Sequence, residues 1–220
     1  MSLAFRATEA RALDDLHTFL TRAARVDEGS VRLIAGSGVL AVYVAVLYPV
    51  GLTDETPTVL GLRTLALADS ASFDAVVPIR SLIQRVERVR ESGGSDEVGL
   101  PMEVGSVTWA GISPPRGGWR PIPPLASDRL DAIARGGIRE VSEVLPDGAG
   151  EQIVRTVRSE VWSRPIAGAE HIPAGAAFAA LALGFLGGDE VRAYETGPWT
   201  RLTSERGHVL VRRRAWTLSR

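Results

Sequence analysis

A run of ten apolar residues, Val39–Tyr48, directly follows the short segment Gly36-Ser37-Gly38. The run is rich in Val and also contains Tyr, and β-branched and aromatic residues favour an extended backbone. An uninterrupted apolar run of this length is typical of a strand whose two faces are both covered. The sequence therefore predicts a buried strand, and the rest of the fold has to cover it.

The segment Gly36–Ala41 also fits the dinucleotide-binding fingerprint G-x-G-x-x-A. That fingerprint needs a helix after its glycines, because the helix N-terminus holds the pyrophosphate. Here a strand-like stretch, Val31–Ala35, comes before the glycines and the apolar strand comes after them. The nearest acids that could bind a ribose are Asp54 and Glu55, in an expected loop. We therefore interpret the glycines as a hairpin turn and expect no cofactor.

The first half of the chain, residues 1–112, is expected to combine this hairpin with helices and further strands. Apolar residues at helical spacing predict helices at 8–25 and 75–91. Strands are expected at 58–67 and around 104–109, and residues 92–100 are expected to form a loop.

Residues 113–127, SPPRGGWRPIPPLAS, contain five prolines and two glycines. This composition argues against regular structure and predicts a linker between two halves.

The second half, residues 128–220, is expected to be helical with a terminal β-hairpin. The predicted helices are 128–144, which Gly136-Gly137 weaken in the middle, 149–163 and 173–186. Alternating residues at 191–195, 199–202 and 208–213 predict the hairpin. The fold class is therefore α+β: a mainly antiparallel sheet flanked by helices, followed by a helical segment that a β-hairpin closes.

The most apolar stretch, Ile172–Gly188, carries no charge. A helix between Pro173 and Gly187 has about 14 residues and spans about 21 Å, whereas a bilayer core needs about 30 Å. We expect a buried core helix, no membrane association and a cytoplasmic location, since the first residues also lack the apolar core of a signal peptide. Its small residues Ala176, Ala180 and Gly184 share one side, which packs on helix 149–163 or forms a subunit interface. Self-association is expected.

Composition excludes several chemistries. The chain has no Cys, no Lys and no Asn, all 25 of its cationic residues are Arg, and its net charge is −1. Disulfides, thiolate nucleophiles, Lys Schiff bases and P-loop lysines are therefore excluded. The three histidines, His17, His171 and His208, are isolated, with His17 close to Asp14. No metal site is expected from them.

The last 30 residues are basic, with seven Arg against two Glu, and Trp199 and Trp216 lie among them. Strand alternation puts Trp199 with Arg201, and His208 with Arg212. Because Val209 and Val211 are expected to face inward, these four residues, Trp199, Arg201, His208 and Arg212, form the candidate site for a small anion such as a phosphate or carboxylate. The alternative is that Trp199 fills the seam between the hairpin and the helices while the arginines are solvated.

Three helices followed by a hairpin is also the order of a winged helix. The third helix would then have to reach DNA base edges with polar side chains. Helix 173–186 has none, so nucleic acid is not expected as a partner. If nucleic acid does bind, the basic C-terminal hairpin has to bind it.

Two sets of residues give the chain a resemblance. One set is Ile172-Pro173, Leu183–Gly187, Val191–Tyr194 and Gly197-Pro198-Trp199; the other is Arg25-Val26-Asp27, Val31-Arg32-Leu33 and Val39–Val42. Both resemble a family of uncharacterised actinobacterial proteins with no assigned activity. The resemblance covers most of the chain, and it implies no catalytic residue.

We favour a non-enzymatic binding or assembly protein, because no nucleophile, base and orienting group come together in the sequence. Two alternatives remain open. One is an enzyme whose site forms only in three dimensions, with His208, Glu205 and arginines as its candidate groups. The other is a nucleic-acid-associated protein that uses the basic hairpin.

Overall fold

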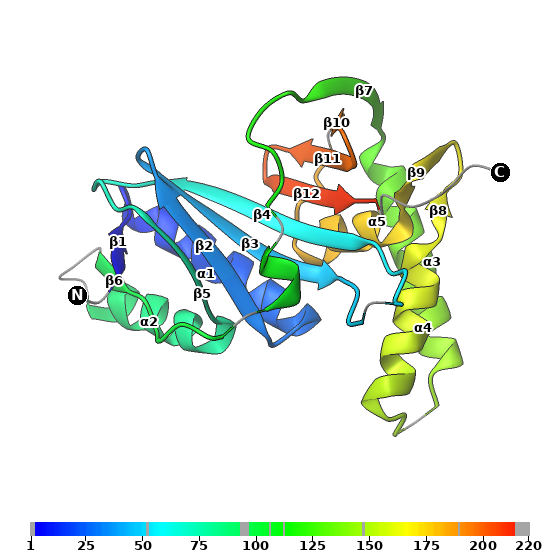
Figure 1. The fold of residues 1–220 in the computed structure, drawn as a ribbon, viewed down its shortest axis with the longest axis horizontal. Coiled ribbons are helices and arrows are strands. Elements are labelled where there is room, and N and C mark those ends of the chain that lie inside the picture. The colour runs from blue at the N-terminus through cyan, green and yellow to red at the C-terminus, as the bar shows by residue number, and fades with distance from the viewer. Residues whose placement is uncertain are drawn as a thin grey trace. The chain divides into compact units, whose positions relative to one another are not determined.

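The chain forms two compact units. The computed structural model describes residues 3–51, 53–92, 97–105, 107–111, 113–146, 148–188 and 190–213. Unit 1 comprises Met1–Ala45 and Leu62–Ile112, and unit 2 comprises Val46–Gly61 and Ser113–Arg220. Each unit combines antiparallel strands with helices (Figure 1), so the chain is an α+β protein, as predicted.

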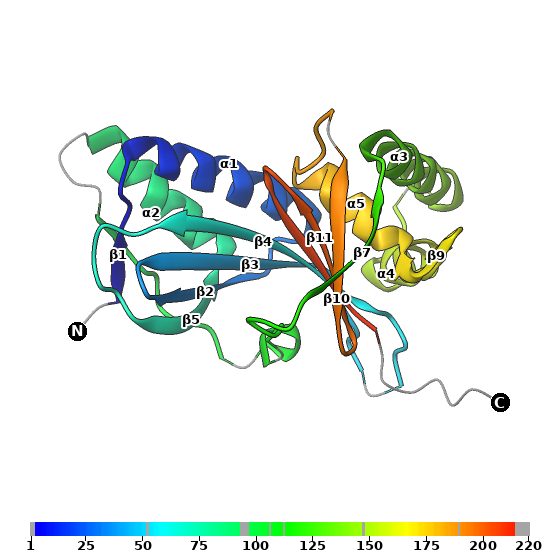
Figure 2. The same cartoon turned by 90° about the horizontal axis from the view of Figure 1, so that it is seen from above.

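Unit 1 is a sheet with two helices on one face. Its elements are β1 (Ala4–Arg6), α1 (Ala10–Val26), β2 (Ser30–Gly36), β3 (Val39–Leu47), β4 (Thr58–Ala66), β5 (Phe73–Pro78), α2 (Ile79–Ser92), β6 (Glu97–Gly99) and the 3₁₀ helix η1 (Thr108–Gly111). The strand order is β5-β2-β3-β4, and β1 pairs separately with β6. Helices α1 and α2 lie side by side on the same face of strands β2–β5 (Figure 2).

The turn between β2 and β3 confirms the hairpin interpretation. Gly36 pairs with Val39, so only Ser37 and Gly38 form the connection. Their φ angles are 53° and 75°, and two consecutive positive φ values are the signature of a type I′ hairpin turn. The residues after Gly38 are strand, so the segment lacks the helix N-terminus that a pyrophosphate needs.

Strand β3 is covered on both faces only in its second half. Buried and partly exposed residues alternate from Leu40 onward, and then all residues from Val44 to Leu47 are buried. The prediction of cover on both faces is therefore wrong for the first half. In that part of the strand the two helices of unit 1 lie on one face only, and the opposite face stays partly open.

Three other boundaries in unit 1 differ from the predictions. Residues 75–78 belong to β5 and not to a helix, because Val76 and Val77 pair with β2 and α2 begins only after Pro78. Residues 97–99 form β6 where a loop was expected. A 3₁₀ helix, η1, occupies Thr108–Gly111 where a strand was expected, and its Trp109 is buried.

Arg32 joins three elements of unit 1. Its guanidinium donates two hydrogen bonds to the Asp74 carboxylate, at 2.8 and 2.6 Å, and a third to the carbonyl oxygen of Ala110 at 2.6 Å. The side chain of Arg32 is 14% exposed and that of Asp74 is 50% exposed. The hydrogen bonds from Arg32 hold the pKa of Asp74 below its ordinary value.

This pair predicts a pH-dependent contribution to stability. A carboxylate whose pKa is lower in the folded state stabilises the fold above its unfolded pKa of about 3.9, and this contribution is lost as the pH falls through the folded value. We expect Asp74→Asn to lower the free energy of unfolding at pH 7 by about 1 kcal/mol, a value reduced by solvent screening of the half-exposed carboxylate.

Urea denaturation from pH 7 down to pH 3 measures this effect. The difference between wild type and Asp74→Asn should shrink as the pH falls, and Arg32→Met should remove it in a double-mutant cycle. An equal loss of stability at pH 7 and pH 3 contradicts the assignment.

Unit 2 packs its strands against a layer of helices. Its elements are β7 (Arg120–Leu125), α3 (Ser127–Val144), α4 (Glu151–Ser163), β8 (Pro165–Ile166), β9 (Ala169–Pro173), α5 (Ala174–Ala182), β10 (Val191–Thr196), β11 (Trp199–Ser204) and β12 (Gly207–Arg212). The strand order is β12-β11-β10-β7, and β8 pairs with β9. Helix α5 contacts β12 and lies between the strands and helices α3 and α4 (Figure 2).

The proline-rich segment contains a strand, which corrects the expectation that it lacks regular structure. Residues Arg120–Leu125 form β7 and pair with β10. Strand β7 lies at the end of the strand order, and an edge strand tolerates proline because half of its N–H groups have no ladder partner. The prolines also make this edge a poor template for further pairing.

The buried helix α5 ends earlier than predicted. Gly184 has a φ of +74°, the N–H of Gly184 bonds to the carbonyl of Leu181, and the N–H of Phe185 bonds to that of Ala180. These two bonds form a Schellman motif, which ends a helix at a left-handed residue. Gly184 and not Gly187 is therefore the stop. Among the described residues, no helix has the length and apolar character to cross a membrane.

The small residues of α5 pack inside unit 2. Ala176 is 0% exposed and Ala180 is 2% exposed. The helix contacts α3 as well as α4, so both residues are used in packing within the chain. Ala176 and Ala180 are therefore buried within the chain and form no subunit interface, whereas Gly184, the third residue of the set, is partly exposed.

A single glycine allows α3 and α4 to approach each other. A Cβ atom on Gly137 would lie 2.4 Å from the Trp162 ring, whereas a Cβ on the neighbouring Gly136 would meet nothing within 4 Å. Trp162 is 2% exposed and stacks on Phe178 of α5 at a centroid distance of 4.4 Å. Its ring is therefore held on both sides and has no room to move.

The two glycines predict opposite effects of the same substitution. Gly136→Ala should stabilise the protein by about 0.5–1 kcal/mol, because alanine restricts the unfolded chain and favours helix. Gly137→Ala should destabilise it by about 1–3 kcal/mol, because the methyl group overlaps the fixed indole ring. Thermal unfolding of the two variants and of the wild type measures these two changes in stability. Equal destabilisation by Gly136→Ala and Gly137→Ala contradicts the packing described for Trp162.

Candidate functional site

Strands β11 and β12 of unit 2 carry the four residues of the predicted site, and β10 pairs with β11 beside them. Arg201 on β11 lies opposite Tyr194 on β10 and Leu210 on β12. Directly paired residues of neighbouring strands point to the same face of a sheet. This face, called the strand face below, therefore has three rows of residues: Arg192, Thr203 and His208; Tyr194, Arg201 and Leu210; and Thr196, Trp199 and Arg212.

The other face of the same strands is apolar and packs on the helices. Leu202, Val209 and Val211 are each at most 1% exposed, and β12 contacts α5. Side chains alternate between faces along a strand, so burial of these residues directs the arginines to the strand face. The inward packing of Val209 and Val211 follows the prediction.

Arg201 is the central cation of the strand face, and it has no anionic partner among the described residues. Its guanidinium carbon lies 4.6 Å from the centroid of the Trp119 ring and 4.8 Å from that of Tyr194. Its Nε is buried and forms no hydrogen bond within the described chain. Burial lowers the pKa of Arg201, and the positive charge of Arg192 acts in the same direction. A guanidinium stays protonated in proteins, so an unneutralised charge remains here.

Two further arginines extend this positive charge across the sheet. Arg192 is exposed and Arg212 is half-buried. The side chains of both form no hydrogen bond or ion pair with other described residues. The nearest acid on these strands, Glu195, alternates to the opposite face and bonds to Arg120 at 2.9 Å. The described part of the strand face therefore has cations and no carboxylate.

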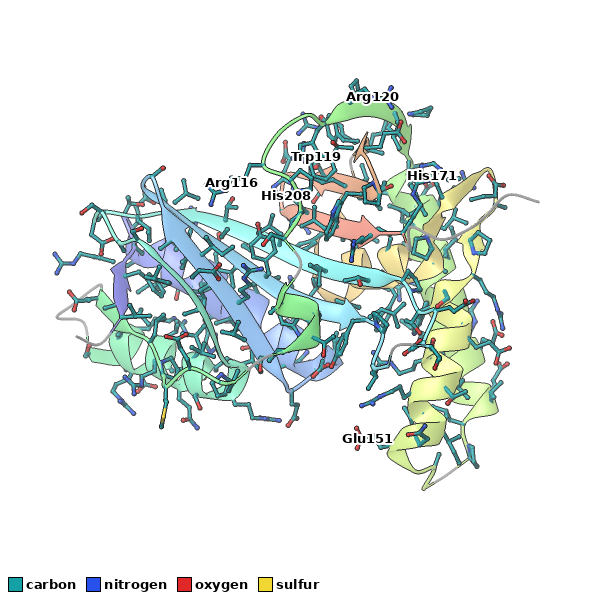
Figure 3. All side chains as sticks on the ribbon, viewed as in Figure 1. Arg116, Trp119, Arg120, Glu151, His171 and His208 are labelled. Atoms are coloured by element: carbon teal, nitrogen blue, oxygen red, sulfur yellow. The ribbon has the colours of Figure 1, made fainter. Side chains whose placement is uncertain are left out.

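The structure brings Trp199, Arg201, His208 and Arg212 to one face. Trp199 is only 4% exposed, so its ring is buried, and its register places it on the strand face and not on the face that packs on the helices. His208 is half-buried, and its Nδ1 lies 3.1 Å from the Thr203 hydroxyl. Figure 3 shows His208 and Trp119 over the strands of unit 2. Binding of an anion at these residues stays a prediction.

Sequence reasoning missed Arg192, Tyr194 and Trp119. The first two alternate with the buried Val191 and Ala193, so the strand pattern contained the signal, but only the register of β10 with β11 places them beside Arg201. Trp119 lies about 80 residues before Arg201 in the chain, in the segment expected to be a linker, and no local pattern connects it to the site.

The rest of the basic terminal segment does not join this face. Arg206 donates a hydrogen bond to the carbonyl oxygen of Leu186 at 3.1 Å, and Arg213, which follows β12, donates one to the carbonyl oxygen of Gly197 at 3.4 Å. Arg214, Trp216 and Arg220 lie outside the described residues.

The histidines stay apart from one another. The His17 Nε2 atom lies 2.8 Å from the Glu87 Oε1 atom of α2, and Asp14 accepts a hydrogen bond from Arg90 of the same helix, so His17 and Asp14 have different partners. His171 is on β9 and His208 is on β12. Within the described ranges, no group of three or more His, Asp or Glu residues could hold a metal ion.

A cavity of about 760 Å³ lies at the start of α3 and is a poor anion site. Its lining includes Asp128, Asp131 and Glu190 together with one cation, Arg135. Arg135 already bonds to Asp131 at 2.6 Å. Because this lining is mainly acidic, the strand face is the better candidate for an anion site.

Two family models match the chain. Residues 1–111 match the model described as a domain of unknown function, DUF8010, and residues 114–216 match the one described as DUF8185. These matches confirm the resemblance to a family with no assigned activity. The sequence matches none of the curated proteins at a significant level.

Solved structures with a similar fold include bacterial polymerase clamps. Caulobacter crescentus pol III beta has a TM-score of 0.52 at 12% identity, and the match covers 100% of this chain and 66% of the pol III beta chain. The C. crescentus beta sliding clamp with bound PEG has a TM-score of 0.50 at 11% identity, covering 99% and 67%. The DNA polymerase III subunit beta of Pseudomonas aeruginosa has a TM-score of 0.47 at 13% identity, and the match covers 100% of this chain and 66% of that chain. This chain thus spans about two thirds of the clamp length, and the likeness to the two Caulobacter crescentus structures shows a shared fold.

Arg201 provides the test of the strand face as an anion site. We expect Arg201→Met to retain wild-type stability within about 1 kcal/mol, because the apolar chain still packs on both rings and a buried unpaired donor disappears. Phosphate should raise the melting temperature of the wild type, by about 3–6 °C at ten times its Kd, and should leave Arg201→Met unchanged.

Arg155→Met, on an exposed arginine of α4 that pairs with Glu151, is the matched control. It should respond to phosphate as the wild type does. An equal phosphate response of Arg201→Met and wild type rules out the strand face as the anion site.

Proposed function

We propose that this chain, which belongs to the family of the domain of unknown function DUF8010, is a non-enzymatic binding and assembly protein with a clamp-like fold. The observation that carries the binding role is Arg201, a partly buried guanidinium that lies against two aromatic rings and has no described anionic partner. An unpaired charge of this kind is costly in a folded protein. A bound anion would offset that cost.

The ligand of this site is proposed to be anionic. Arg192, Arg201 and Arg212 share one face with His208 and with the hydroxyl groups of Thr196 and Thr203. Arginine matches the geometry of phosphate and carboxylate groups with paired N–H donors. Trp119 and Tyr194 hold the guanidinium of Arg201 in place, so that less side-chain entropy is lost when a ligand binds.

Self-association is the second part of the proposal, and the clamp-like fold supports it. The similar structures are those of a sliding clamp and of a polymerase subunit, names that describe parts of an assembly. This chain also exposes large apolar side chains on the hairpin of helices α3 and α4, namely Ile138, Val144 and Ile153. The far end of that hairpin, marked by Glu151 in Figure 3, lies away from the strands of unit 2.

Sedimentation velocity tests the assembly role. At micromolar concentration we expect a species larger than the 23.5 kDa monomer, and Ile153→Asp should shift it toward the monomer by placing a charge on the apolar hairpin. Val50→Asp, on an exposed valine outside the helices, is the matched control and should leave the distribution unchanged. A wild type that sediments only as a 23.5 kDa species contradicts self-association.

A further inference from the structure

The three arginines of the strand face lie on one diagonal. Arg192 is in the first row on β10, Arg201 is in the second row on β11, and Arg212 is in the third row on β12. Each step crosses one strand and moves two residues along it. Diagonal neighbours of this type are about 7–8 Å apart in an antiparallel sheet, so the outer two arginines are separated by about 15 Å.

A single small anion cannot use this whole array. One phosphate group can bridge two neighbouring guanidinium groups, but three cations spread over about 15 Å match a ligand with negative charges at regular intervals. One sugar–phosphate repeat of a nucleic acid spans a distance comparable to one diagonal step. The array therefore fits successive phosphates of one strand.

Aromatic rings beside the diagonal favour a nucleic acid over other polyanions. Trp119 and Tyr194 are half-buried and lie within cation–π distance of Arg201. Bases of single strands stack on aromatic rings and on arginine guanidinium planes. The phosphates and the bases of one strand would thus find different partners on the same face.

The argument against nucleic-acid binding, that the helix α5 cannot reach base edges, does not apply to the strand face. That helix lacks polar side chains for base edges, but single-strand binding depends on backbone charge and stacking, which a sheet face provides. The absence of carboxylates on the described strand face leaves its positive potential unneutralised.

Resting on the proposed anion site, we propose that the diagonal Arg192–Arg201–Arg212 on the strand face binds the backbone of a single-stranded nucleic acid. Binding neutralises up to three phosphates and releases their counterions. For single strands the slope of log K against log salt concentration is about −0.7 per phosphate, so this face predicts a slope of about −2.

Fluorescence anisotropy with a labelled oligothymidylate of about twenty nucleotides tests the proposal, since this length exceeds the 4–16 nucleotides held by one single-strand binding fold. The affinity is measured at several sodium chloride concentrations. Arg192→Gln, Arg201→Gln and Arg212→Gln should each make the slope shallower by about 0.7. Arg155→Gln, the control on α4, should leave the slope unchanged, and circular dichroism checks that each variant is folded.

Three outcomes overturn the proposal. The first is a slope of log K against log salt concentration that none of the three variants changes. The second is binding of a DNA duplex or of inorganic polyphosphate with a higher affinity than that of the oligothymidylate. The third is stabilisation of the wild type by inorganic phosphate without any binding of the oligothymidylate. In that last case the anion site of the proposed function stands and only the single-strand ligand is wrong. If phosphate does not raise the melting temperature of the wild type, both the anion site and the single-strand ligand are wrong.

Discussion

Burial of Leu202, Val209 and Val211 in the layer beneath β11 and β12 orients the whole C-terminal sheet of unit 2. The side-chain period of a strand is two, so a register slip of one residue would move every arginine of the strand face into the helix layer. An unpaired guanidinium in that layer is far more costly than one at the surface. The apolar side of the sheet therefore fixes both the packing of unit 2 and the composition of its polar side.

Two partly buried arginines show how packing separates structural from functional charge. Arg32 donates hydrogen bonds to Asp74 and to the carbonyl of Ala110, and these bonds tie β2, β5 and η1 together. Arg201 is also partly buried but lies against two aromatic rings, with a buried Nε that bonds to no described group. Natural proteins keep such local conflicts mainly where function needs them. The contrast between Arg32 and Arg201 is the reason to place the site in unit 2.

The likeness to sliding clamps and the site carry different kinds of information. At 11–12% identity, the similar structures with the higher TM-scores show that the chain shares a fold, and one fold serves many unrelated functions. Nothing in that likeness points to Arg192, Arg201 and Arg212. Their role is argued from register, burial and charge, and it stands or fails independently of the fold comparison.

The sequence by itself determined the local features of this protein. Gly36-Ser37-Gly38 between apolar runs determined the hairpin, because few residues besides glycine adopt the positive φ values of a type I′ turn. Alternation along 199–202 and 208–213 determined which residues share a face. Tertiary structure decided the rest. It ended α5 at Gly184, paired the proline-rich β7 with β10, and brought Trp119 to Arg201. Such contacts join residues far apart in the chain, and their energy depends on neighbours that a local sequence pattern does not contain.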